Sequence, residues 1–179
     1  VISPSGGRAD TLVIDRTSPF NPAEFIGAGW TIWKGPADGD GLSGEEEQDE
    51  RSLDLTQVEI SKIRLETCLE EGKNYIKGEE RIRRLMAAGY IRLDAKIFQA
   101  FWENKDKIPE RWREETNGYT TYVSFDGTEL RSPSGHRCTL ALCGDDGGWG
   151  WDYSRLGRDW YVCHPSAVLV SIETLILCP

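Results

Sequence analysis

The chain has 179 residues and a formal net charge of −9, with 39% hydrophobic and 28% charged residues. This composition is typical of a globular domain and excludes an intrinsically disordered chain, which would have fewer hydrophobic residues. No apolar run approaches the roughly 20 residues of a membrane-spanning helix, and the first residues lack the pattern of a signal peptide. We therefore expect a soluble protein. Because the chain is acidic, and anionic membranes and nucleic acids attract basic proteins, we expect no membrane partner and little tendency to bind nucleic acid.

The five cysteines are an odd number in a chain that is large enough to fold without disulfides. This pattern favours reduced thiols and a cytoplasmic location. The length fits one domain, residues 1–179. The oligomeric state has no signal in the sequence.

The N-terminal part predicts two short strands and one loop. Residues 1–10 have the glycines, serines and proline of a mobile lead-in, and Thr11–Asp15 is β-branched enough for a strand. Phe25–Trp33 alternates apolar side chains around glycines, which favours a second strand. Residues 35–51 carry seven acids and several glycines, so they predict a flexible acidic loop that passes into a helix near Glu45–Glu47.

The middle part, residues 54–116, predicts helices. The first is expected to begin at Asp54 or Thr56 and to end at Gly72. A second is expected from Gly78 to Ala88, because acids occupy its first turn and Gly89 follows it. A third begins near Asp94 and ends before Pro109, where a short further turn continues through Trp112.

The last part, residues 118–177, changes to the period-two pattern of strands. Tyr119–Phe125 is a strand, Asp126-Gly127 is a hairpin signal, and Thr128–Arg131 is the returning strand. Further strands are predicted at Arg137–Cys143, Trp149–Tyr153, Asp159–Val162 and Ser166–Leu177. The sequence thus predicts an α+β fold, in which three to four short helices pack on a twisted antiparallel meander formed mainly by the C-terminal third.

Several segments resemble a family of small uncharacterised bacterial proteins. They are FDGTELRSPSGHR, WGWDYSRLGRDW and PSAVL, together with Asp15–Phe20, Arg51–Arg64 and Gly78–Trp102. The resemblance spans most of the chain and implies one domain. It implies no activity, cofactor or catalytic residue.

The densest group of candidate functional residues is aromatic. Trp149, Trp151 and Tyr153 occupy alternate positions and share a strand face, and Trp160 and Tyr161 follow closely. If the row is exposed, it forms a stacking platform for a carbohydrate, a peptide or a protein partner, with Arg155 and Arg158 at its rim. If it is buried, it is the wall of a core. Aromatic rows are more often core, so this alternative stays open.

A second candidate is a zinc site. His136, Cys138, Cys143, Cys163 and His164 all lie in the predicted sheet and include both histidines of the chain. Thiolate and imidazole ligands suit zinc, but no paired C-x2-C knuckle is present. Isolated buried thiols are the simpler interpretation.

Three further patterns are weaker. Asp38, Asp40 and Glu45–Glu47 invite a calcium loop, yet serine stands where such a loop needs glycine, so a solvated loop is preferred. Ser134 and His136 with Asp126 or Asp145 have the residue types of a catalytic triad. This interpretation is weak, because serine is expected in a PSG turn for its turn conformation alone. No common hydrolase, metalloprotease or nucleotide-binding motif is present.

The basic segment around the predicted second helix suggests a nucleic-acid binder. Six basic residues stand there among three acids, at Lys77, Arg81, Arg83, Arg84, Arg92 and Lys96. A winged helix-turn-helix has this order of elements, although the acidity of the whole chain opposes it.

The sequence therefore predicts a noncatalytic binding or interaction domain that uses the Trp/Tyr-rich sheet. The alternative from another class is a small hydrolase, dependent on a metal or paired carboxylates, in the same region. Its residues would be His136, Cys138, Asp145, Asp146, Cys163 and His164.

Overall fold

The computed structural model describes residues 10–35 and 44–171. The predicted lead-in, the acidic residues Asp38 and Asp40, and the end of the last predicted strand lie largely or wholly outside these ranges. The α+β prediction is confirmed, since four helices accompany a mostly antiparallel sheet. The longest described helix has ten residues, too few to cross a bilayer.

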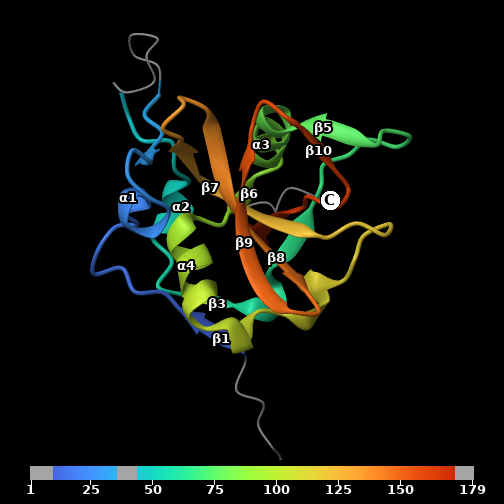
Figure 1. Ribbon diagram of the computed structural model, residues 1–179, viewed down its shortest axis with the longest axis horizontal. Helices are drawn as coiled ribbons and strands as arrows, with labels where there is room; N and C mark the ends of the chain where they lie inside the picture. The colour runs from blue at the N-terminus through green and yellow to red at the C-terminus, as the bar shows by residue number, and fades with distance from the viewer. Residues whose placement is uncertain (1–9, 36–43, 172–179) are drawn as a thin grey trace, which may run out of the picture.

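The elements follow one another in a mixed order (Figure 1). The helices are α1 (Pro22–Phe25), α2 (Glu50–Leu53), α3 (Gly78–Ala87) and α4 (Ala95–Glu103), with short 3-10 turns at Ile60–Lys62, Lys105–Lys107 and Glu110–Arg113. The strands are β1 (Thr11–Val13), β2 (Thr31–Ile32), β3 (Gln57–Glu59), β4 (Arg64–Glu66), β5 (Tyr75–Lys77), β6 (Tyr90–Arg92), β7 (Tyr122–Arg131), β8 (Arg137–Asp145), β9 (Gly148–Arg155), β10 (Asp159–Tyr161) and β11 (Ser166–Val170).

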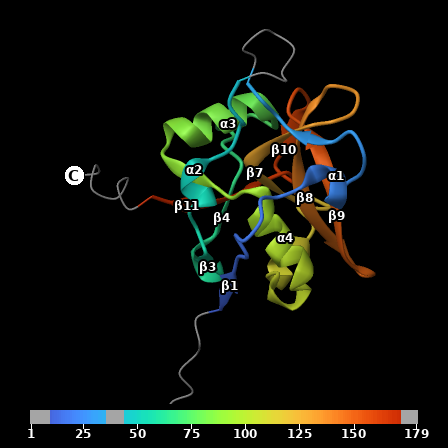
Figure 2. The same cartoon turned by 90° about the vertical axis from the view of Figure 1, so that its left-hand side faces the viewer.

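The main sheet has the strand order β4-β11-β7-β8-β9, with β2 beside β7 and β6 beside β11. Strands β7, β8 and β9 form an antiparallel meander, and β11 joins β7 in parallel at Ser166 and Ser124. The strand predicted at Asp159–Val162 is β10, which pairs with β5 and not with this sheet. Two small antiparallel pairs, β1 with β3 and β5 with β10, lie outside this sheet. The pair β5 and β10 lies beside α3, away from α4 (Figures 1 and 2).

Two apolar clusters form the interior. The larger one joins α4 to β7 and β8, and Phe98, Phe101, Trp112 and Phe125 pack there ring against ring. The smaller one joins α3 to β5 and β10 through Ile76, Ile82, Leu156 and Trp160. The second cluster packs the β5 and β10 pair against α3.

Helix α4 begins where the sequence predicts, because Asp94 caps it. The Asp94 carboxylate accepts hydrogen bonds from the backbone N–H groups of Lys96 and Ile97. It also accepts hydrogen bonds from Nη1 and Nη2 of Arg16, at 3.0 and 2.8 Å, and from the Ser52 hydroxyl. One fully buried carboxylate thus joins the N-terminal segment, α2 and α4.

The predicted hairpin at Asp126-Gly127 is wrong, because β7 continues through these residues, with a shift in its pairing with β8 between Phe125 and Leu130. The Gly127 N–H donates to the Leu93 carbonyl at 2.9 Å, and the Gly127 carbonyl accepts from the Asp49 N–H at 2.8 Å. A Cβ at position 127 would lie 2.1 Å from the Arg92 carbonyl oxygen. This glycine therefore serves a close approach between backbones and not a turn.

The predicted helix from residue 54 is also wrong. Val58 and Ile60 are buried while Gln57 and Glu59 are exposed, which is the period of a strand. Strands β3 and β4 occupy this segment, and Cys68 has a φ of 53°, outside the helical range. The expected strand at Phe25–Trp33 is reduced to β2, and helix α2 begins at Glu50 under an Asp49 cap.

We predict that Gly127→Ala lowers the free energy of unfolding by about 3 kcal/mol or more, since the added methyl group meets a fixed backbone carbonyl. Urea unfolding measures this loss. The matched control is Gly157→Ala, whose Cβ would meet nothing within 4 Å and which should change stability by less than about 0.5 kcal/mol. Equal effects of the two substitutions would contradict the close approach.

Candidate functional site

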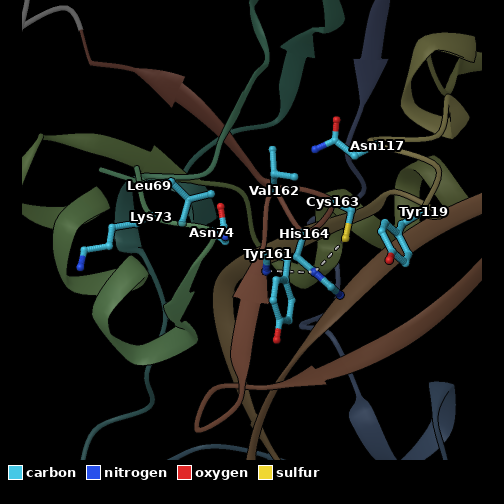
Figure 3. A pocket seen from close by; sticks show the side chains of 9 residues that line it. All are labelled: Leu69, Lys73, Asn74, Asn117, Tyr119, Tyr161, Val162, Cys163 and His164. Atoms are coloured by element: carbon cyan, nitrogen blue, oxygen red, sulfur yellow. Dashed lines mark hydrogen bonds between the residues drawn. The ribbon is translucent and has the colours of Figure 1, made fainter. Parts of the chain in front are cut away.

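A cavity of about 710 Å³ opens beside the strand pair β5 and β10 (Figure 3). We call it the tyrosine pocket. It is lined by three segments that are distant in sequence: Leu69, Lys73 and Asn74; Asn117 and Tyr119; and Tyr161, Val162, Cys163 and His164. Its volume lies within the range of roughly 300–1,000 Å³ that small-molecule sites have.

Tyr161 and His164 line the pocket and belong to a longer series of ring contacts. The Tyr161 ring centroid lies 6.1 Å from that of Tyr75 and 6.3 Å from that of His164. The His164 imidazole in turn stacks on Tyr122 at 5.4 Å with an interplanar angle of 13°. Tyr161 is 46% exposed and Tyr119, on the other side, is 69% exposed. These two rings present open aromatic surface to a ligand.

Strand β10 sets the direction of Tyr161. Trp160 and Tyr161 are neighbours and point to opposite faces, so Trp160 is buried in the second cluster while Tyr161 faces the pocket. The Trp160 indole N–H donates to the Arg155 carbonyl at 3.1 Å, and the Arg81 guanidinium carbon lies 5.0 Å from the Trp160 ring centroid. Tyr161 therefore stands on a fixed support.

A tight turn positions Tyr119. Asn117 and Gly118 both have positive φ, at 54° and 77°, and the backbones of Thr116 and Tyr119 bond to each other in both directions. The Thr121 hydroxyl then donates to the Glu114 carbonyl at 2.7 Å and closes the loop. Because the turn holds its own backbone bonds, the Tyr119 side chain is free to project outward.

Cys163 and His164 lie in contact but are not an activated pair. The imidazole Nδ1 accepts the Tyr161 backbone N–H at 3.3 Å and lies 3.4 Å from the Cys163 Sγ. Burial lowers the pKa of His164 and raises the pKa of the Cys163 thiol. Both groups are therefore neutral near pH 7, with the imidazole proton on Nε2, and the thiol is not a strong nucleophile.

The polar groups of the pocket are mainly hydrogen-bonding groups. Lys73 is the one charged residue among those that line it, and the amides of Asn74 and Asn117 come from opposite sides (Figure 3). Among the residues that the structure describes, no carboxylate lines the pocket. The site can accordingly offer several donors beside aromatic faces.

The predicted aromatic row does share one strand face, but that face is turned mainly toward the core. Trp151 is partly buried, with its ring centroid 5.2 Å from Phe25 and 6.5 Å from Phe98. Trp149 also packs on the larger cluster. Tyr153 is 39% exposed and lies edge-on to Trp30 at 4.8 Å. The most exposed tyrosines are Tyr119, Tyr75 and Tyr161, and none of them belongs to this row.

The other residues predicted to bind a ligand lie in three different places. Tyr161 lines the tyrosine pocket, whereas Arg155 and Arg158 line a smaller cleft near Arg137. Trp160 lies in the interior between α3 and β10. The structure therefore does not bring the seven predicted residues onto one surface.

The five predicted zinc ligands do not converge on one site, although Cys163 and His164 are in contact. Cys138 and Cys143 are five residues apart on β8, so they point to opposite faces, and Cys138 is fully buried in the core. His136 and the pair Cys163 and His164 line different cavities. Across residues 10–35 and 44–171, no three His, Cys, Asp or Glu side chains form a group that could hold a metal. The four cysteines in these ranges are free thiols.

The basic residues around α3 do not form one open face. Arg81 and Arg92 are buried, and Arg83, Arg84 and Lys77 pair with acidic side chains. Of the remaining hydrolase candidates, Asp145 and Asp146 are exposed at the β8–β9 turn and do not line the tyrosine pocket.

Sequence reasoning missed most of the pocket. Leu69, Lys73, Asn74, Asn117, Tyr119 and Val162 line it without having been singled out. The Asn117-Gly118 turn was the available signal, because it marks where the chain reverses before an exposed tyrosine. The pairing of β5 with β10, which brings Tyr75 to Tyr161, has no local signal.

Comparison with known proteins adds no further evidence: no protein-family model, curated protein or solved structure matches this chain.

We predict that His164 makes stability depend on pH below neutrality. Its folded pKa lies below the ordinary 6.5, so the folded state binds fewer protons than the unfolded state in that window. The free energy of unfolding should fall as the pH is lowered from 6.5 through the folded pKa. His164→Gln should lack this component. Urea unfolding at several pH values measures the difference in the free energy of unfolding between wild type and variant. A difference that does not change with pH would contradict the account.

Proposed function

We propose that the protein is a noncatalytic carbohydrate-binding domain whose ligand occupies the tyrosine pocket. The observation that carries the proposal is the pair of open rings, Tyr161 and Tyr119, on a cavity of about 710 Å³. Tyrosine rings bury the apolar C–H face of a sugar at a small cost in side-chain entropy.

The polar groups of the pocket suit a ligand with hydroxyl groups around its edge. The Asn74 and Asn117 amides each have two N–H donors and one carbonyl acceptor. The neutral His164 contributes an Nε2–H donor, because its Nδ1 is occupied by the Tyr161 N–H. Lys73 provides the single charge. The set favours a neutral saccharide over a strongly charged ligand.

A binding role is preferred to a hydrolytic one for the same site. Hydrolysis by Cys163 would need a thiolate, and burial raises the pKa of this thiol. Glycoside hydrolysis would need two carboxyl groups at the pocket, and the residues that line it include none. The chemistry of the lining therefore supports recognition without reaction.

We predict that a panel of neutral mono- and disaccharides, screened by saturation-transfer NMR, contains ligands, and that calorimetry gives their affinity. Tyr161→Ala and Tyr119→Ala should each weaken binding about 5- to 30-fold, which corresponds to about 1–2 kcal/mol of lost ring contact. Tyr119 is 69% exposed, so its removal should change the free energy of unfolding by less than about 0.5 kcal/mol.

The matched control is Tyr153→Ala. Tyr153 is also a partly exposed tyrosine, at 39%, but it does not line the pocket. This variant should bind the saccharides as the wild type does. Absence of any saccharide with a Kd below about 10 mM, or an equal loss of affinity in all three variants, would overturn the proposal.

A further inference from the structure

A second cavity, of about 360 Å³, is lined by an unusual number of basic groups. We call it the arginine cleft. It is lined in part by the start of β8 and by the connection from β9 to β10, and none of its lining residues lines the tyrosine pocket. Its lining consists of Trp33, Glu79, Gly135, His136, Arg137, Arg155, Gly157 and Arg158.

Arg137 is held in place from behind. Its Nε donates to the Glu129 carboxylate at 3.0 Å, and its Nη2 pairs with the same carboxylate, which is buried. The remaining nitrogen, Nη1, lies 3.7 Å from the Glu79 Oε1, beyond hydrogen-bonding distance. The guanidinium is therefore oriented by Glu129 while Nη1 keeps unused donors.

The cleft also uses Trp33 as a wall. The Arg137 guanidinium carbon lies 5.4 Å from the Trp33 ring centroid, so the ring adds to the orientation of the guanidinium. Trp33 is itself fixed, since its backbone N–H donates to the Glu129 carbonyl at 2.8 Å. Glu129 thus positions both the arginine and the tryptophan of the cleft.

Arg155 and Arg158 come from one short turn. The Arg158 N–H donates to the Arg155 carbonyl at 3.1 Å, and that carbonyl also accepts the Trp160 indole N–H. Within residues 10–35 and 44–171, no carboxylate forms an ion pair with either guanidinium. Three arginines therefore face two carboxylates, Glu79 and Glu129, in a protein whose formal net charge is −9.

Such an arrangement has a chemical match. Guanidinium groups donate paired hydrogen bonds to oxyanions, and phosphate accepts them from several directions at once. A cavity at the small end of the usual ligand range leaves room for a phosphate and a small organic group beside Trp33.

We propose that the arginine cleft binds the phosphate group of a small phosphorylated molecule. Arg155 and Arg158 supply the uncompensated charge, and Arg137 supplies oriented donors. Glu79 opposes the bound anion and so limits its affinity. This site is independent of the proposed saccharide site, and either can fail without the other.

The experiment uses the full chain at low salt, with inorganic phosphate, glycerol 3-phosphate and acetate as separate probes in calorimetry. We expect phosphate and its ester to bind at millimolar concentration or better, and acetate to bind at least 5-fold more weakly. Arg155→Gln and Arg158→Gln should each weaken phosphate binding at least 5-fold. Glu79→Gln should strengthen it about 3-fold, a gain that damage to the fold would not produce.

Arg111→Gln is the matched control, because Arg111 is an exposed arginine that lies outside the cleft. Its affinity for phosphate should equal that of the wild type. Three outcomes would overturn the proposal: no phosphate binding below about 50 mM, equal losses in Arg111→Gln and Arg158→Gln, or tighter binding of acetate than of phosphate. If inorganic phosphate binds and the ester does not, the assignment to a phosphorylated molecule is wrong.

Discussion

The whole domain depends on the contact between Asp126-Gly127 in β7 and the backbone of Arg92 and Leu93. Gly127 bonds to Leu93 on one side and to Asp49 on the other, and no side chain fits between. The fully buried Asp126 accepts the Ser166 hydroxyl, and the Arg92 guanidinium donates to the Asp126 carbonyl at 2.6 Å. Burial raises the pKa of Asp126 and lowers the pKa of Arg81 to about 10. The attraction between the two charges opposes both shifts, because it stabilises the ionised form of each group. Polar groups therefore fix the centre of the sheet.

From this centre, the two ends of β7 support the two candidate sites. Near its start, the Tyr122 N–H donates to the Cys163 carbonyl at 2.8 Å, and the Tyr122 ring stacks on His164. Near its end, Glu129 orients Arg137 and bonds through its backbone to Trp33. Arg81 connects the centre to the tyrosine pocket, because it donates to the His164 carbonyl and packs on Trp160. The same strand thus contacts residues that line each of the two cavities.

The sequence predicted the helices and strands whose positions depend on residues close to them in the chain. Helices α3 and α4 lie where caps, charges and the following glycine or proline indicate, and the alternation of β8 and β9 was also predicted. The hairpin at Asp126-Gly127 failed because a distant backbone at Arg92 determines the conformation there. The tyrosine pocket could not be predicted for a similar reason. Its residues come from three segments, distant in sequence, that the pairing of β5 with β10 and the Asn117-Gly118 turn bring together.

The central claim is that recognition occurs at the tyrosine pocket and not at the tryptophan row of β9. Backbone chemical-shift mapping with a bound saccharide tests this most directly. The account predicts shifts that concentrate at residues 73–74, 117–119 and 161–164, with little change at Trp149, Trp151 and Tyr153. Shifts concentrated along β9, with residues 161–164 unchanged, would contradict it.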